Sequence, residues 1–126
     1  MTVWPARVHE SARPLPADTL TYLSKTTASY VHVSLEAIKD QNIPADSADS
    51  SNWQLDFWPH KDQTEWVKFE WDESHELSQV RVYWFDDTGR GACRLPEAWR
   101  VLYKRSDGEF VPVQNRSPYE RQKDRF

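Results

Sequence analysis

The strongest constraint on the fold is a strict alternation in residues 65–71, which read Glu-Trp-Val-Lys-Phe-Glu-Trp. Val67, Phe69 and Trp71 fall on one face of an extended chain, and the charged side chains between them fall on the other. A period of two is typical of a β-strand that buries one of its faces. We therefore predict a half-buried strand here, which must pair with other strands to satisfy its backbone.

Other segments indicate partners for this strand. Residues 79–85 repeat the alternation, and residues 99–104 form a third apolar and aromatic run. Residues 106–108, Ser-Asp-Gly, predict a hairpin turn, because glycine readily takes a positive φ. The return strand is 109–113, and its Pro112 belongs on an edge or at a bulge. Short strands separated by turns predict an all-β fold, an antiparallel jelly-roll β-sandwich.

The first half of the chain is less regular. Residues 19–34 contain β-branched and aromatic side chains that suit an edge strand. Residues 33–39 suit a single helical turn instead, with Leu35 and Ile38 three apart. Residues 40–52 are polar and rich in Asp and Ser, which predicts a loop.

Length, charge and cysteine content exclude several classes of protein. The 126 residues suffice for one domain, and the net charge is −4 with scattered basic residues, so we expect no nucleic-acid binding. No apolar run approaches about 18 residues, so we expect no membrane contact. The start of the chain lacks a charged and apolar leader, so we expect no signal peptide. Cys93 is the sole cysteine, which excludes an internal disulfide and a multi-cysteine zinc site.

The aromatic content of 13%, with seven Trp, is high. Most such rings belong in a core, because aromatic side chains bury more area than others. A surplus of rings is also expected where a protein recognises sugars or other proteins, since a flat ring face stacks on a sugar. Both interpretations, a binding surface and an entirely structural set of Trp, remain open at this point.

A group of motifs then resembles a known family. The motif-bearing segments are 58–61 (WPHK), 64–67 (TEWV), 82–85 (VYWF), 86–103 (DDTGRGACRLPEAWRVLY), 107–108 (DG) and 112–113 (PV). Within residues 26–113 they resemble the galactose-binding-like module, also called discoidin or factor V/VIII type C. More narrowly, they resemble the C-terminal module of glycoside hydrolase family 127-like proteins, the β-L-arabinofuranosidase group. The opening residues 1–4 resemble the strand that precedes this module in those enzymes.

The resemblance implies a galactose-binding-domain-like sandwich and a division of the chain. Residues 1–18 would be a strand remnant and linker from an upstream domain, and residues 19–126 the discoidin-like module. Modules of this type continue past the position of Val113, so we expect the final strands to be missing, which leaves an open sheet edge. The family's catalytic barrel would lie upstream of this chain. Nothing in the spacing selects a catalytic pair of carboxylates either, so we expect no enzyme activity from the chain alone.

The resemblance implies an accessory module of a glycoside hydrolase. As a binding module it would bind carbohydrate, by family implication an arabinose-containing glycan. As a structural domain it would instead pack against the catalytic domain of the parent chain and stabilise it. A protein–protein adhesion module is the third possibility. Exposure of Trp53 and Trp58 beside the 86–94 loop would favour binding, and burial of every Trp with a flat apolar patch left open would favour packing.

The loop at residues 86–94 is the first candidate for sugar binding. Asp86, Asp87, Arg90 and Arg94 offer charged groups that form strong, directional hydrogen bonds with hydroxyl groups. Glycines in the loop let its backbone approach a ligand. The alternative is that one of these carboxylates pairs with one of the arginines and fixes the shape of the loop.

Trp58 and His60 form a second candidate, because they lie in an irregular segment where an exposed ring would stack on a sugar. A packed Trp58 and a hydrogen-bonded surface His60 are the alternatives. Asp40, Asp46 and Asp49 are the candidate ligands for a structural calcium ion, which many discoidin-like modules hold in a loop near the equivalent place.

Overall fold

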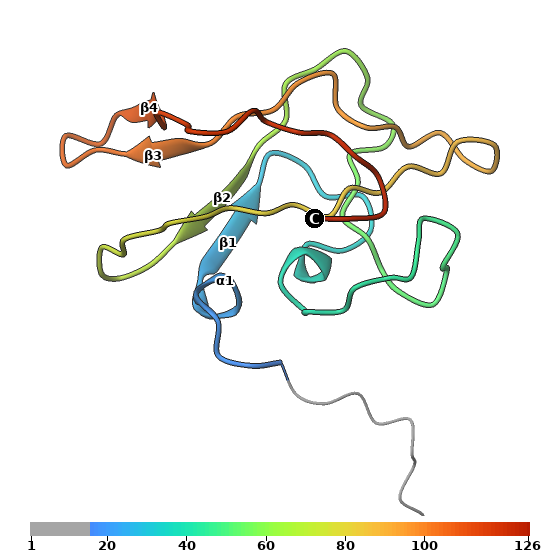
Figure 1. Cartoon of the computed structure of the whole chain (residues 1–126), viewed down its shortest axis with the longest axis horizontal. Helices are drawn as coiled ribbons and strands as arrows, with labels where there is room; N and C mark the ends of the chain where they lie inside the picture. Colours follow the sequence, from blue (N-terminus) through green and yellow to red (C-terminus); the bar gives the residue numbers. More distant parts are fainter. Residues whose placement is uncertain (1–15) are drawn as a thin grey trace, which may run out of the picture.

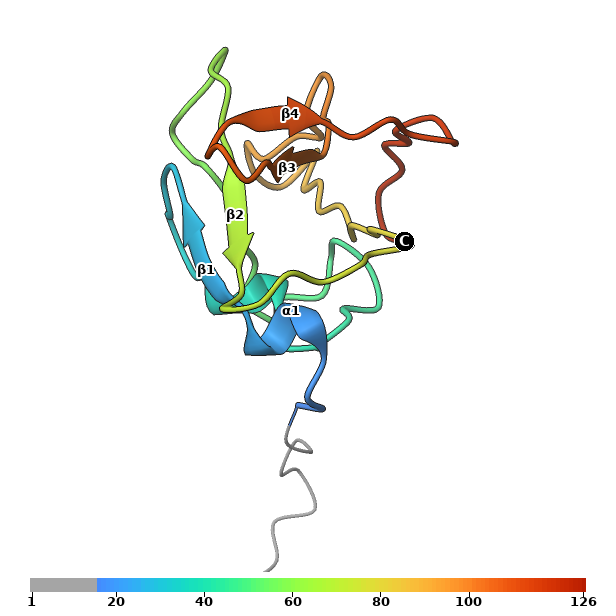
Figure 2. The same ribbon diagram turned by 90° about the vertical axis from the view of Figure 1, so that its left-hand side faces the viewer.

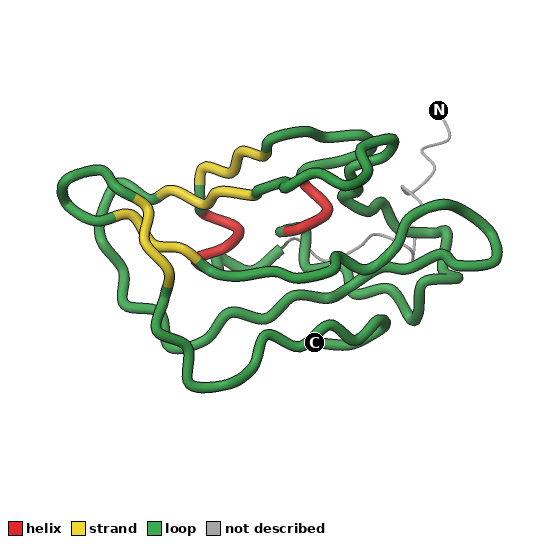
Figure 3. The backbone as a smooth tube through the Cα atoms, turned by 90° about the horizontal axis from the view of Figure 1, so that it is seen from above, coloured by secondary structure: helices red, strands yellow, loops and turns green. Residues whose placement is uncertain are grey.

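The computed structural model describes residues 16–126, so most of the predicted strand remnant and linker (1–18) lies outside the described part. Loops and turns make up most of the trace (Figure 3). The regular elements are short, and in chain order they are α1 (Leu20–Leu23), β1 (Lys25–Ala28), the 3-10 turn η1 (Glu36–Ile38), β2 (Val67–Glu70), β3 (Leu102–Lys104) and β4 (Phe110–Pro112).

Strands β1 and β2 form an antiparallel ribbon in which Lys25 lies opposite Glu70. Ser29 extends the pairing beyond β1, because its backbone N–H donates to the Trp66 carbonyl at 2.9 Å. Lys68 Nζ contacts Glu70 Oε2 at 2.9 Å, so these alternate side chains of β2 share one face. The predicted strand is confirmed over Val67–Glu70, which is shorter than residues 65–71, but all four residues are half-buried, so its two faces do not differ in burial as predicted.

Strands β3 and β4 form the second antiparallel ribbon, above the first in the view of Figure 2. The predicted hairpin turn is confirmed: Gly108 has φ +90°, and its N–H donates to the Arg105 carbonyl at 2.9 Å. Pro112 pairs with Leu102 at the end of β4, on an edge of a two-stranded sheet. At an edge the missing N–H of proline interrupts no further ladder.

The predicted edge strand over residues 19–34 is wrong in its extent. A helical turn, α1, precedes β1 because the Thr19 hydroxyl accepts a hydrogen bond from the Tyr22 N–H at 3.1 Å and so caps it. Only Lys25–Ala28 is extended and paired. The alternative of one helical turn within residues 33–39 is confirmed by η1.

The predicted strand at residues 79–85 is also wrong. Its only ladder contact within the described chain is an isolated parallel bridge between Trp84 and Lys123. Beside that bridge the Asp124 N–H donates to the Trp84 carbonyl at 3.1 Å. The C-terminal segment thus runs along these residues, with the chain end near the centre of Figure 1. Alternation makes residues 79–85 compatible with a strand, but a strand also needs a neighbour to pair with over its length.

The two ribbons give the chain a mostly non-helical, β-containing character, and they do not enclose an apolar core. Among residues 16–126 no apolar side chain is buried, and the buried polar ones are Ser24, Ser47 and Asp56, at 4%, 5% and 8% exposure. In the same part of the chain no helix has the length and apolar character needed to cross a membrane. The jelly-roll arrangement therefore goes beyond what the two ribbons establish.

Candidate functional site

Trp58 lies in the loop before β2 with its ring partly open to solvent, at 41% exposure. Its backbone N–H donates to Asp56 Oδ1 at 3.0 Å, which fixes the backbone beneath the ring. The Lys61 ammonium lies 5.6 Å from the ring centroid, within the range of a cation–π contact. Trp58 therefore presents an accessible ring, and part of its face has a cationic neighbour.

His60 is held from two sides. Its Nδ1 lies 2.6 Å from Glu65 Oε1, and its ring stacks on Tyr30 with centroids 4.1 Å apart. Glu65 also accepts a hydrogen bond from the Ser29 hydroxyl, beyond the end of β1. Ser29 first, and His60 after it, lower the pKa of Glu65 below its usual value. His60 is thus the hydrogen-bonded histidine that the sequence left as an alternative, and it ties its loop to the β1–β2 ribbon.

The carboxylates of the 86–94 loop bind backbone groups of the same loop. Asp86 Oδ1 accepts from the Thr88 N–H at 2.8 Å, and the Thr88 hydroxyl and backbone together lower the pKa of Asp86. Asp87 Oδ1 accepts from the Cys93 N–H at 2.9 Å, across the loop. Both side chains are half-buried. They act first as caps that fix the path of the loop backbone.

The arginines of this loop are occupied as well. Arg94 Nη1 lies 3.4 Å from Asp87 Oδ1 and also donates to the Cys93 carbonyl at 2.7 Å. Arg90 reaches out of the loop and donates to the carbonyls of Ser47 and Ala48. The alternative in which an aspartate pairs with an arginine to hold the loop matches the Asp87–Arg94 contact.

Cys93 lies at the end of the 86–94 loop and is half-buried. Burial first, and then the carboxylates of Asp56 and Asp87, raise the pKa of its thiol to about 11. Asp56 also lies 2.8 Å from His32 Nδ1 and fixes the backbone of Trp58. Most polar groups of both candidate groups therefore already have partners within their own segments.

The three aspartates predicted to bind calcium each accept hydrogen bonds from nearby residues of their own loop. Asp40 accepts from the Asn42 N–H at 2.9 Å, and Asp46 accepts from the Ala48 N–H at 2.6 Å. Asp49 lies at the centre of several hydrogen bonds, and the Ser51 side chain and backbone lower its pKa most. Within residues 16–126 no three His, Cys, Asp or Glu side chains are placed to hold a metal ion. These carboxylates do not fit a calcium site of that kind.

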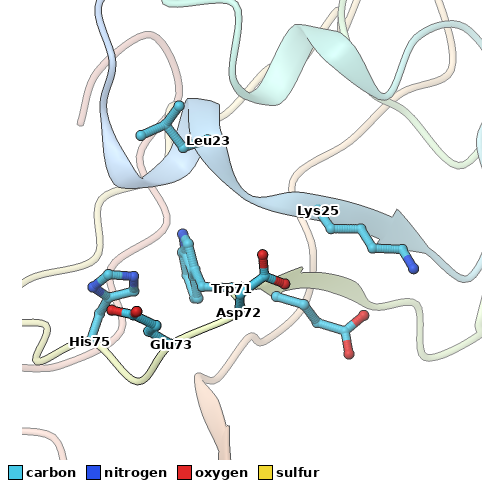
Figure 4. Close-up of a pocket in the computed structure, with 7 residues that line it drawn as sticks. Leu23, Lys25, Trp71, Asp72, Glu73 and His75 are labelled. Atoms are coloured by element: carbon cyan, nitrogen blue, oxygen red, sulfur yellow. The ribbon is translucent and has the colours of Figure 1, made fainter.

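Sequence reasoning missed a pocket of about 390 Å³ at the end of the β1–β2 ribbon. It is lined by Leu23, Lys25, Glu70, Trp71, Asp72, Glu73 and His75. Figure 4 shows the Trp71 ring standing between the Asp72 carboxylate on one side and Glu73 and His75 on the other. The signal was present in the sequence, because an acidic run with a histidine directly follows the last aromatic residue of the predicted strand.

A second hollow, of about 290 Å³, lies between residues 80–84 and the C-terminal segment. Aromatic rings form one wall: Trp99 lies edge-on to Trp84 at 5.6 Å and to Tyr119 at 4.8 Å. The Phe126 ring has the Arg81 guanidinium 5.3 Å from its centroid. These aromatic rings therefore lie close together, and none of them is fully buried.

Comparison of the chain with protein-family models, with curated proteins and with solved structures finds no match. Function must therefore be argued from the residues and their geometry.

Proposed function

We propose that the chain is a non-catalytic accessory module that packs against another domain and stabilises it. By the resemblance of residues 26–113 to the C-terminal module of β-L-arabinofuranosidase-type proteins, that domain would be a glycoside hydrolase barrel. The proposed fold is the galactose-binding-like jelly roll, completed by strands or surfaces that the partner supplies.

The observation that carries this proposal is the absence of any buried apolar side chain among residues 16–126. Burying one large apolar side chain contributes about 1.5–3 kcal/mol, and folding must offset a large loss of chain entropy. The exposed large apolar side chains are Leu20, Tyr22, Leu23, Val31, Ile43, Trp53, Trp58, Trp66, Leu77, Val80, Leu102, Tyr103, Phe110, Val113 and Phe126. A polypeptide with that surface is expected to bury it against a partner.

Unpaired strand edges support the same proposal. Each ribbon has two strands, so every strand has one edge without a ladder partner in the described chain. Residues 79–85 carry a strand pattern but make a single bridge. An isolated two-stranded ribbon is marginally stable in water, whereas added strands or a packed neighbour stabilise it. A partner that pairs with these edges would complete both sheets.

The experiment is thermal unfolding of the purified chain alone and when co-expressed with a barrel domain of the resembled enzyme group. We expect the chain alone to bind the apolar dye ANS and to melt without a cooperative near-ultraviolet transition. With the barrel we expect a stable complex, reduced dye binding and a cooperative melt. A cooperative melt of the chain alone without dye binding, and no complex, would contradict the proposal.

Carbohydrate binding is the second candidate, because a specific observation favours it. Trp53 is 71% exposed and Trp58 is 41% exposed, as a module that stacks rings on a sugar requires. We propose an arabinose-containing glycan as its ligand, by the same resemblance. A saturable fluorescence change with arabinose-containing oligosaccharides, lost in Trp58→Ala and kept in Trp66→Ala, would support this candidate. Binding that survives in Trp58→Ala would contradict the assignment of the ring.

A further inference from the structure

The pocket at the end of the β1–β2 ribbon has a wall formed by Trp71. The indole Nε1 donates to the Leu20 carbonyl of α1 at 2.7 Å, which fixes the ring against the helical turn. Phe69 stacks near the ring, with centroids 6.5 Å apart. His75 meets it edge-on, with centroids 5.8 Å apart and planes at 79°. The rings of Trp71 and His75 thus form a corner at nearly a right angle. The hydrogen bond to Leu20 holds the indole of this corner in place.

The lining of the pocket carries more negative than positive charge. Glu70, Asp72 and Glu73 supply three carboxylates, and Lys25 supplies the one ammonium among the seven lining residues. Lys25 lies directly opposite Glu70 in the ribbon, and Lys68 forms an ion pair with Glu70 at 2.9 Å. Lys68 lowers the pKa of Glu70 most, which keeps this carboxylate ionised at neutral pH. Glu70 thus has cationic neighbours already.

Asp72 and Glu73 differ from Glu70 in this respect. Within the described chain neither side chain has a hydrogen-bond or ion-pair partner, and both are exposed. Figure 4 places them on either side of the Trp71 ring, while Lys25 extends away from it. Within the described residues the corner of the two rings is therefore flanked by two carboxylates that are not held in an ion pair.

We propose that this pocket binds an ammonium group. A cation over the face of an indole is attracted by the ring quadrupole, and Trp is the best of the aromatic side chains in this role. The carboxylates of Asp72 and Glu73 add an attraction that a neutral ligand would not receive. A methylated ammonium fits best, because its methyl groups contact the ring faces while its charge needs no hydrogen-bond acceptor. The proposal does not depend on carbohydrate binding, and it requires only that α1 and the β1–β2 ribbon are formed.

The test is a titration of the full chain with choline, followed by NMR of the indole N–H and backbone amide signals. We expect saturable shifts of the Trp71 indole and of residues 70–75, at millimolar concentrations. The neutral isostere 3,3-dimethylbutan-1-ol should bind about two- to fivefold more weakly, the fold-change expected from an exposed cation–π contact. Equal shifts with the neutral isostere would overturn the proposal.

Variants separate the pocket from general surface effects. Asp72→Asn combined with Glu73→Gln should weaken choline binding severalfold and leave the ribbon amides in place. Asp62→Asn combined with Glu97→Gln removes the same charge elsewhere and should change little. Trp71→Leu should abolish the shifts of residues 70–75, and Trp53→Leu, at a 71% exposed ring outside the pocket, should not. Unchanged binding in the first double variant would overturn the assignment.

Ammonium groups are carried both by small molecules and by lysine side chains of peptides, so the titration has a second arm. A short peptide with one trimethyl-lysine that binds more tightly than choline would identify a protein ligand, and choline binding as tightly would identify a small molecule. The titration is run on the chain alone and on its complex with the barrel domain, and β1–β2 amide protection identifies the samples in which the ribbon is formed. A Trp71 signal that choline does not shift in a sample with protected β1–β2 amides would overturn the proposal.

Discussion

The Asp87 carboxylate occupies the space that a side chain on residue 91 would need. A Cβ on Gly91 would lie 1.9 Å from Asp87 Oδ2, far inside contact distance. Asp87 is held there by the Cys93 N–H at 2.9 Å and by Arg94. A side chain at position 91 would therefore have to displace the Asp87 carboxylate, so the glycine and the cap that Asp87 forms depend on each other.

Gly91→Ala is predicted to expel the Asp87 carboxylate and release the Cys93 N–H. Hydrogen exchange at that amide should accelerate about tenfold, equivalent to about 1.4 kcal/mol, as expected for one lost hydrogen bond. Asp87→Ala should have a similar effect by itself. Adding Gly91→Ala to Asp87→Ala should then change the exchange rate little, because the clash is gone. Equal effects of Gly91→Ala in both backgrounds would contradict this coupling.

The Cys93 thiol is predicted to react slowly with alkylating reagents. Its pKa of about 11, raised first by burial and then by Asp56 and Asp87, leaves little thiolate at pH 8. We expect iodoacetamide to modify it on the order of a hundredfold more slowly than a free cysteine. Asp87→Asn should lower the pKa and speed the reaction. The raised pKa also means that the folded loop loses stability as the pH rises from about 9 to about 11.

Local patterns in the sequence predicted local structure well. The glycine at 108 predicted a turn with positive φ, which depends on neighbouring residues alone. The alternation around Val67 and Phe69 predicted β2, and β1 supplies the pairing that this strand needs. Residues 79–85 show the limit of this reasoning. Their alternation is as regular, but pairing requires a second strand, and the sequence of one segment does not contain its partner.

The candidate site shows the same limit. Asp87 and Arg94 were predicted as sugar ligands or as a pair, and their 3.4 Å contact depends on the path of the loop between them. The pocket around Trp71 depends on α1, whose Leu20 carbonyl holds the indole from 51 residues away in sequence. Such long-range contacts leave no periodic pattern in the sequence. The acidic residues after Trp71 therefore could not be predicted to line a pocket.

Glu65 is predicted to titrate below the usual range of a glutamate, because the Ser29 hydroxyl and His60 hydrogen-bond its charged form. Its contribution to folding is therefore present above the usual pKa and is lost as the pH falls through the lowered value. Side-chain NMR of Glu65 should give a midpoint below 4.5, the model-peptide value. Ser29→Ala should raise that midpoint the most and His60→Asn less. A midpoint unaffected by Ser29→Ala would contradict the assignment.

Arg90 is predicted to connect the 86–94 loop to the 46–49 loop. A substitution of Arg90 distinguishes this structural role from a role in sugar binding. Its guanidinium donates to the Ser47 and Ala48 carbonyls, and Ser47 is one of the few buried residues. Arg90→Ala should remove the donor from these carbonyls and destabilise the 46–49 loop by about 0.5–1.5 kcal/mol, seen as faster amide exchange there. Arg100→Ala removes an equal charge from an exposed position and should have no such effect. If Arg90→Ala instead leaves exchange unchanged and weakens binding of an arabinose-containing oligosaccharide, Arg90 is a ligand-contacting residue and the connector role is wrong.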